Sequence, residues 1–287
     1  MSNAAPDRAG SFGWVALVYA IACSVAWIVM SSFEGEPAPL ALGAGMLASV
    51  AVTFLASIWL ENGSVFDPWW SVLPPLVALH LVEEWTPLAI ACVLVVFVWA
   101  VRLTVNWAIA WPGLHHEDWR YALLYQRSPL PQWLTLFLAV QLVPAVFVYL
   151  GSLPLVPALE RGGELGPVGL FACALGLFAA GLELASDEQR RAVAAAKPGA
   201  LMDVGLWAWC RHPNYLGEIL FWVSLWLFGV AADPGALFWT ALGPLAIVGL
   251  FLGASIPLIE ERNAARRPGW AEYKARTPKL LPRAPRR

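Results

Sequence analysis

Long apolar stretches constrain the fold of this chain more than any other feature of its sequence. Seven of them approach the ~20 residues that an α-helix needs to cross the hydrocarbon core of a membrane. They run from Trp14 to Met30, Pro39 to Leu60, Pro87 to Ala110, Trp133 to Leu150, Val168 to Leu184, Tyr215 to Ala231 and Gly235 to Ile259. We therefore predict an all-α, polytopic transmembrane helical bundle without a β-sheet domain.

Composition agrees with a membrane protein. Charged residues make up 13% of the 287 residues and hydrophobic residues 59%, whereas a soluble domain has about 25% charged residues. The 17 Trp residues are typical of the interfacial belts of membrane proteins. The stretch from Trp69 to Val82 is shorter and contains Pro74 and Pro75, so it is either a tilted span or a re-entrant segment. The prediction is seven or eight spans.

Loop charges indicate the orientation. The acidic or nearly neutral loops and the basic loops alternate without exception if the chain has eight spans. The first set holds Glu34/Glu36, Glu83/Glu84, Glu160/Arg161/Glu164 and Asp233, and the second holds Arg120/Arg127, Arg190/Arg191/Lys197/Arg211 and the tail from Arg262 to Arg287. The positive-inside rule then places both termini in the cytoplasm. With seven spans the N-terminus lies outside, and the C-terminus stays cytoplasmic. We treat residues 1–287 as one integral membrane domain, in which 260–287 form a basic cytoplasmic tail.

Polar residues within or beside the apolar stretches gather on the predicted cytoplasmic side. They are Asn62, Asp67, Arg102, Asn106, Asp118, Arg120, Tyr121, Glu183 and Asp187, together with the groups between Arg211 and Glu218 and at Glu260, Glu261 and Arg262. Ionisable groups in a bilayer are costly and usually functional. Because random solvation of helix ends would decorate both sides, we expect a polar ligand held between the cytoplasmic helix ends.

The run from Arg211 to Glu218 opens one of the spans. Pro213 suits the first turn of a helix, and Asn214, Glu218 and Trp222 recur every four residues, so they share one face. His212 either contacts the ligand or hydrogen-bonds the helix end.

Simpler interpretations exist for several of these residues. Arg102 could extend to the interface from its span end, and Gln141 could bond a neighbouring helix. The basic tail could only anchor the chain to anionic lipid. His115, His116, Glu117 and Asp118 are adjacent in one loop and lack a spaced second pair of ligands, so no metal site is predicted.

A family resemblance is visible at these residues. The run Arg211-His212-Pro213-Asn214-Tyr215-Leu216-Gly217-Glu218, followed by residues 260–282, resembles the C-terminal domain of the steroid 5-alpha-reductase superfamily, in particular its bacterial multi-span branch. Further matches are Phe66-Asp67-Pro68-Trp69-Trp70, Arg102-Leu103, Glu117-Asp118-Trp119-Arg120-Tyr121, Gln141 with Ser152-Leu153-Pro154, and Glu183 with Asp187 and Gln189. The resemblance covers roughly residues 64–282. Isoprenylcysteine and phospholipid methyltransferases carry a similar Arg-His-Pro-Asn-Tyr run.

The resemblance implies an NADPH-dependent reductase of a C=C bond in a sterol-like or polyprenoid lipid. It also implies cofactor contacts from Asp187, Asn214, Glu218 and Tyr273, with His212 and Tyr215 beside them and Arg211 and Arg262 near the phosphates. Arg guanidinium groups suit phosphate oxygens, and Asn and Glu can bind the carboxamide and ribose hydroxyls. Asn62, Arg102, Asn106, Asp118, Arg120, Gln141 and Glu183 are expected to line the site.

The chain departs from the resembled family at one position. The steroid reductases have a Tyr three residues before the Arg that matches Arg102, and this chain has Trp99. An indole cannot supply a phenolic proton, so we expect Tyr121 or Asp67 to donate the proton instead.

Two other function classes stay open. One is an S-adenosylmethionine-dependent membrane methyltransferase of a small lipid or prenyl thioether, which needs no Arg set because that cofactor has no phosphate. The other is a non-catalytic, lipid-binding protein on the same scaffold. In each case the expected partners are a lipid-like small molecule and membrane lipids rather than nucleic acid. We expect the bacterial inner membrane as the location, with the cofactor site facing the cytoplasm.

Overall fold

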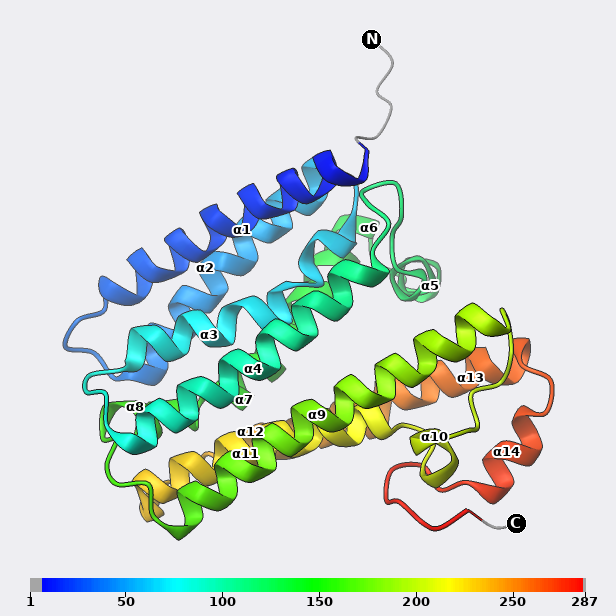
Figure 1. Ribbon diagram of the computed structural model, residues 1–287. Helices are drawn as coiled ribbons and strands as arrows, with labels where there is room; N and C mark the ends of the chain where they lie inside the picture. The colour runs from blue at the N-terminus through cyan, green and yellow to red at the C-terminus, as the bar shows by residue number, and fades with distance from the viewer. Residues whose placement is uncertain (1–6, 286–287) are drawn as a thin grey trace.

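The computed structural model describes residues 7–285, and all regular secondary structure within this range is helical (Figure 1). The α-helices are α1 Arg8–Ser31, α2 Ala38–Trp59, α3 Trp69–Leu81, α4 Pro87–Ala110, α5 Trp119–Arg127, α6 Gln132–Thr135, α7 Val143–Ser152, α8 Leu155–Glu160, α9 Pro167–Ala196, α10 Leu206–Trp209, α11 Pro213–Ala232, α12 Leu242–Leu250, α13 Ile256–Arg266 and α14 Trp270–Arg276. Short 3-10 or π-helical turns are η1 Gly63–Phe66, η2 Leu136–Leu142, η3 Pro234–Ala236 and η4 Phe251–Ser255. The last two arginines of the predicted basic tail lie outside the described residues.

Within residues 7–285, seven helices are long and apolar enough to cross a membrane. They are α1, α2, α4, the run Gln132–Ser152 that joins α6, η2 and α7, then α9, α11, and the run Leu242–Arg266 that joins α12, η4 and α13. Leu, Ile, Val, Phe and Trp side chains are widely exposed on these helices, as expected for a surface that faces lipid. The predicted helical membrane bundle is confirmed.

The short helix α3 accounts for the choice between seven and eight spans. Its 13 residues extend for about 20 Å, which is less than the ~30 Å hydrocarbon core. Even so, α3 takes the chain from the end of α2 to the start of α4, at the other end of the bundle (Figure 1). The start of α1 therefore lies beside the end of α4, where Arg8 Nη2 donates to the Ala108 carbonyl oxygen over 2.9 Å. The side of the membrane on which this end lies stays a prediction.

The helices α9 and α11 pack closely along their length, and this contact positions the polar site. Gly217 of α11 faces α9, and a Cβ atom at this position would lie 2.4 Å from Cγ of Glu183 and 2.9 Å from the Ala179 carbonyl oxygen. Small residues permit such close approach between membrane helices. As a result, Glu183 on α9 is held directly beside the first turns of α11, where Asn214 and Glu218 lie.

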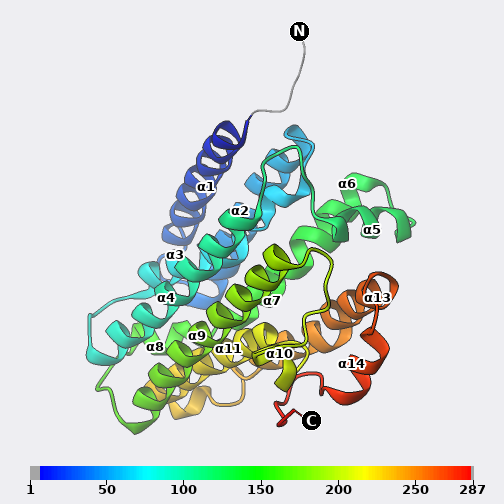
Figure 2. The same ribbon diagram turned by 45° about the vertical axis from the view of Figure 1, so that its right-hand side comes forward.

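Viewed from another direction, α5 and α6 lie at the same end of the bundle as α13 and α14 (Figure 2). Two contacts join these segments: Arg127 of α5 pairs with Glu261 of α13 over 2.8 Å, and the Arg262 guanidinium lies 3.9 Å from the centre of the Trp119 ring. The predicted site residues thus come from segments far apart in sequence that meet at one end of the bundle.

Candidate functional site

Three groups of ionisable side chains occupy this end of the bundle. We call them the Arg102 cluster (Arg102, Glu183, Asp187, Glu218), the Asp67 cluster (Asp67, Asp118, Arg120, Tyr121) and the Glu260 cluster (Arg211, His212, Glu260, Lys274).

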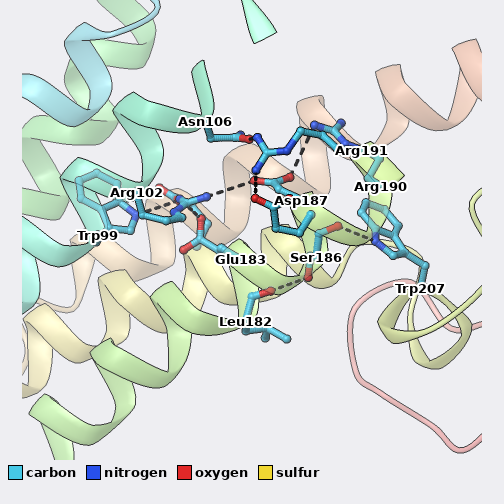
Figure 3. A network of polar contacts seen from close by, with 12 residues as sticks. Trp99, Arg102, Asn106, Leu182, Glu183, Ser186, Asp187, Arg190, Arg191 and Trp207 are labelled. Atoms are coloured by element: carbon cyan, nitrogen blue, oxygen red, sulfur yellow. Dashed lines mark hydrogen bonds and ion pairs between the residues drawn. The ribbon is translucent and has the colours of Figure 1, made fainter. Parts of the chain in front are cut away.

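The Arg102 cluster joins α4, α9 and α11. Arg102 Nη1 lies 3.2 Å from Asp187 Oδ2, and Nη2 donates to Glu183 Oε2 (Figure 3). Nη2 also lies 3.9 Å from Glu218 Oε2. All four side chains are at least nine-tenths buried. Arg102 therefore points inward, and the alternative that it extends to the interface does not describe its position.

Glu218 is enclosed by three indole rings. Its Oε1 accepts hydrogen bonds from Trp70 Nε1 at 2.9 Å and Trp222 Nε1 at 3.0 Å, and its Oε2 accepts one from Trp99 Nε1 at 3.1 Å. Trp99 also stacks on Phe221, with 4.0 Å between ring centres. Sequence reasoning missed Trp70 and assigned Trp residues mainly to interfacial belts; the i,i+4 spacing of Glu218 and Trp222 was the available signal.

The charges of the Arg102 cluster do not balance. Three buried carboxyl groups surround one guanidinium, and the nearest further cation is Arg190, whose Nη2 lies 3.5 Å from Asp187 Oδ1 at the exposed rim. Negative charges this close together repel one another, so the cluster favours an added positive charge. Furthermore, Arg102 Nε and Glu183 Oε1 are buried without a hydrogen-bond partner in the described residues. The cluster is therefore suited to hold a proton or a positively charged group.

Asn214 and Tyr215 lie next to this cluster with free polar atoms. Both side chains are partly buried, and neither the Asn214 amide nor the Tyr215 hydroxyl makes a hydrogen bond within residues 7–285. The Tyr215 ring stacks on Phe251 at 4.6 Å between ring centres. Arg120 and Glu218 both act electrostatically on the Tyr215 phenol, and Tyr215 lies less than one helical turn before Glu218. Their position leaves both groups available to a ligand.

The Asp67 cluster is built by the turn before α3 and by α5. The Tyr121 hydroxyl donates to Asp67 Oδ1, and Arg120 donates to both oxygens of Asp118, with Nε–Oδ1 at 2.8 Å and Nη2–Oδ2 at 3.0 Å. Burial raises the pKa of Asp67 to about 6, although the nearby Arg120 lowers it in part. The structure thus places the two predicted proton donors in direct contact, with a carboxyl group that titrates near neutral pH.

Asn62 and Asn106 also meet neighbouring segments. Asn62 caps η1 by accepting from the Ser64 backbone N–H at 2.8 Å, and its Nδ2 donates to the Leu114 carbonyl oxygen at 2.8 Å. Asn106 Oδ1 accepts from Arg191 Nη1 at 2.7 Å (Figure 3). Asn62 therefore holds the loop before α5 in place, while Asn106 stays at the edge of the Arg102 cluster.

The Glu260 cluster fastens the C-terminal segment to the start of α11. Glu260 Oε1 accepts from Arg211 Nη2 at 2.7 Å and contacts His212 Nε2 at 3.2 Å, and Oε2 lies 3.2 Å from Lys274 Nζ. Burial lowers the pKa of His212, despite the contact with Glu260. The Arg211 guanidinium also donates to the Lys274 and Thr277 carbonyl oxygens. Arg211 is thus fully engaged, so phosphate binding by this residue would require rearrangement.

Two further predicted site residues have structural partners. The Tyr273 hydroxyl donates to the Trp207 carbonyl oxygen at 2.7 Å. Gln141 lies on η2, where its Nε2 donates to Ser57 Oγ at 2.9 Å and its Oε1 accepts from Thr53 Oγ1 at 3.3 Å. The interpretation of Gln141 as a contact between helices matches these bonds. Tyr273 holds α14 against the segment before α11.

Cations without acidic partners lie at the end of α13. Arg266 and Arg267 both act electrostatically on Arg262, and none of the three pairs with a carboxylate in the described residues. Arg262 also interacts with Asp118 and Arg120 of the Asp67 cluster. This cationic group, which we call the α13 arginines, therefore borders the site on its exposed side.

Comparison with known proteins places most of this architecture in one family. The family described as "Protein of unknown function (DUF1295)" matches residues 53–277, a range that holds all three clusters. A protein of Schizosaccharomyces pombe, named only as uncharacterised, is 28% identical over 260 residues, which cover 79% of this chain and 74% of the yeast protein. No solved structure matches. The extent of the family match shows that the chain belongs to the DUF1295 family.

Proposed function

We propose that this protein is a membrane-embedded, NADPH-dependent reductase of a C=C bond in a lipid, related to the steroid 5-alpha-reductase superfamily. The observation that carries the proposal is a change of charge along the site. The α13 arginines form a cationic rim, and the Arg102 cluster forms a buried, acidic interior. Asn214 and Tyr215, with their free polar atoms, lie in the first turn of α11 next to the Arg102 cluster.

This order of charges fits the chemistry of a nicotinamide dinucleotide. Its three phosphate groups need several cations, which Arg262, Arg266 and Arg267 supply without breaking an existing ion pair. Its carboxamide needs a donor and an acceptor, which the Asn214 amide provides. The bound cofactor would supply a hydride and become positively charged, a form that buried carboxylates such as Glu218 stabilise.

The Asp67 cluster supplies the second half of the reaction. Reduction of a C=C bond by a hydride also requires a proton, and Trp99 cannot donate one because an indole N–H is not an acid near neutral pH; this N–H instead donates a hydrogen bond to Glu218. The Tyr121 hydroxyl donates a hydrogen bond to Asp67 Oδ1 in a partly buried contact. Because the pKa of Asp67 is about 6, this pair can be protonated near neutral pH and act as a general acid.

The family match supports this proposal indirectly. Residues 53–277 include the Asp67, Arg102, Glu183–Asp187 and Asn214–Glu218 positions on which the resemblance to the steroid reductases rests. Their convergence at one end of the bundle is what a single cofactor and substrate site requires.

A second candidate is an S-adenosylmethionine-dependent methyltransferase. The excess of buried carboxyl groups around Arg102 favours a cationic ligand, and the sulfonium of S-adenosylmethionine is one. The α13 arginines argue against it, since that cofactor has no phosphate group to neutralise them. We therefore place the reductase first.

Ligand-dependent stabilisation of the purified protein tests the choice. A ligand at about one hundred times its dissociation constant adds ~2.7 kcal/mol to the free energy of unfolding. The reductase requires that NADPH stabilise the protein and S-adenosylmethionine not do so. Stabilisation by S-adenosylmethionine alone would favour the methyltransferase, and no effect of either would favour the non-catalytic, lipid-binding alternative. Copurification of the cofactor after mild detergent extraction gives an independent readout.

A further inference from the structure

A groove between α4 and α9 opens beside the Arg102 cluster. Its volume is about 500 Å³, which lies within the ~300–1,000 Å³ of typical small-molecule sites. Arg102 and Asp187 belong both to the lining of this groove and to the Arg102 cluster. The groove and the proposed cofactor site therefore share one wall.

The outer walls of the groove are apolar and exposed. Val98, Val101, Val105 and Ile109 follow one face of α4 at intervals of three and four residues, and Leu184 faces them from α9. Each of these side chains is more than one-third exposed, and Val101 reaches 59%. Since α4 and α9 are both of membrane-spanning length, this surface faces hydrocarbon. The groove thus opens sideways into the bilayer.

The inner wall of the groove carries the few polar side chains of its lining. Arg102, Asn106 and Arg191 contribute to it, and they are held in place by the bonds of Arg102 to Asp187 and of Asn106 to Arg191 (Figure 3). The Arg102 and Arg191 side chains are mostly buried, so an occupant of the groove meets polar groups only at the inner wall. An occupant with an apolar body and one polar end would satisfy both walls.

The free hydrogen-bonding groups of the inner wall specify that polar end. Asn106 Oδ1 accepts from Arg191, whereas Asn106 Nδ2 has no hydrogen-bond partner within the described residues. Arg102 Nε, one helical turn away, is buried without a partner. Both groups are donors, so the missing partner is an acceptor.

The charges of the inner wall exclude an anionic end. Arg102 is already matched by Glu183 and Asp187, and Arg191 by Glu188. An added phosphate or carboxylate would find no uncompensated cation and would lie among three buried carboxyl groups. An ammonium group would leave both donors unpartnered. A carbonyl or hydroxyl oxygen avoids both problems.

We propose that the α4–α9 groove binds a single lipid molecule through a neutral carbonyl or hydroxyl oxygen, which accepts hydrogen bonds from Asn106 and Arg102, while its apolar body lies against Val98, Val101 and Val105. This inference deepens the proposed function: the lipid reaches the cofactor site from the bilayer, not from the aqueous side. The role as substrate rests on the proposed reductase activity, whereas the binding itself does not.

Photo-crosslinking without any nucleotide tests the binding. Four probes share one long alkyl chain with a diazirine and end in a methyl ketone, a carboxylate, an ammonium or a methyl group. The protein is labelled in nanodiscs, and labelled peptides are identified by mass spectrometry. The ketone probe should label α4 and α9 more than about tenfold better than the methyl-terminated probe, because the ketone gains a hydrogen bond from Asn106 and one from the charged Arg102.

Two variants and one matched control give the test its specificity. Val101→Trp fills the groove from its exposed wall and should abolish most of the labelling by the ketone probe. The matched control, Leu94→Trp, lies on the same helix at 52% exposure but outside the groove lining, and it should leave labelling unchanged. Asn106→Asp keeps the acceptor for Arg191 and removes the Nδ2 donor, so ketone labelling should fall about two- to tenfold while methyl-probe labelling stays constant.

The results separate this inference from the proposed function. Equal labelling by the ketone and methyl probes, stronger labelling by the carboxylate or ammonium probe, or no effect of Val101→Trp would each overturn the groove assignment. Both Trp variants are checked for folding by their thermal stability in detergent. If Val101→Trp is unstable, Val105→Trp on the same wall replaces it. Stabilisation by NADPH is measured on the same samples, so any of these overturning results with NADPH binding intact refutes the groove and leaves the reductase proposal standing.

Discussion

The burial of Glu218 by three indoles leads to a specific prediction about stability. Glu218 Oε1 accepts from Trp70 and Trp222, and Oε2 accepts only from Trp99. In Glu218→Gln the amide oxygen can keep the first two bonds, but the amide NH₂ then faces the Trp99 N–H. One buried donor is left without an acceptor. Glu218→Ala leaves all three donors without one.

The magnitudes follow from the cost of a buried, unsatisfied polar group. Each stranded N–H costs about 1–3 kcal/mol, so we expect Glu218→Gln to lower the free energy of unfolding by about 1–3 kcal/mol. Glu218→Ala should lower it by at least ~3 kcal/mol, since three donors are stranded. In the double variant Glu218→Gln/Trp99→Phe the stranded donor is absent, so the two changes should couple by about 1–2 kcal/mol.

Equilibrium unfolding by SDS titration, with helicity as the readout, measures these free energies. Trp226→Phe is the matched control, because Trp226 lies on the same helix and its Nε1 donates to the Leu237 carbonyl oxygen at 2.9 Å instead of to Glu218. Its effect should add to that of Glu218→Gln without coupling. Additivity of Trp99→Phe with Glu218→Gln, or an effect of Glu218→Ala below ~0.5 kcal/mol, would refute the reasoning.

Three further predictions concern the other parts of the site. Asn214→Ala should change stability by less than ~0.5 kcal/mol, because the amide has no partner in the described residues, yet weaken NADPH binding by about 1–3 kcal/mol in a thermal-shift titration. The pKa of Asp67 is about 6 in the folded protein against an ordinary value of 3.8, so its contribution to the free energy of unfolding is complete below pH ~4. About 3 kcal/mol of that free energy should be lost as the pH rises through 6, and Asp67→Asn should remove this loss from the pH profile of unfolding. Glu260→Gln should weaken the attachment of the C-terminal segment and accelerate cleavage by trypsin at Lys274, since a buried Arg211 loses its charged partner at a cost of about 3–5 kcal/mol; an unchanged cleavage rate would contradict that role.

The fold was largely predictable because the membrane imposes length and polarity on each helix. The apolar stretches alone identify the spans, and the pair Pro74–Pro75 marks the one short segment, α3. The path of α3 was harder to predict, since a helix of 13 residues fits a tilted span and a re-entrant segment equally well. Contacts such as that between Arg8 and the Ala108 carbonyl oxygen are set by tertiary packing and have no local sequence signal.

The site was predictable as a set of residues but not as a set of partners. The sequence predicted that Arg102, Glu183, Asp187 and Glu218 lie at one end of the bundle. The structure brings them together. The sequence did not indicate that Arg211 forms an ion pair with Glu260. Ion pairs of this kind depend on which faces of distant helices meet. Helical periodicity shows which residues share a face, but it does not show which helix packs against that face.

Trp99 connects the stability of the site to its chemistry. A carboxylate can be buried near like charges only if donors surround it, and an indole supplies a donor without adding charge or a titratable group. Trp70, Trp99 and Trp222 together provide three such donors to Glu218. A Tyr at position 99 could supply a proton to a substrate, but the Trp found there is stacked on Phe221 and commits its N–H to Glu218. Trp99 thus holds the Glu218 carboxylate in place. The proton donor must then lie outside the three indoles, and the Tyr121–Asp67 pair has the required contact and pKa.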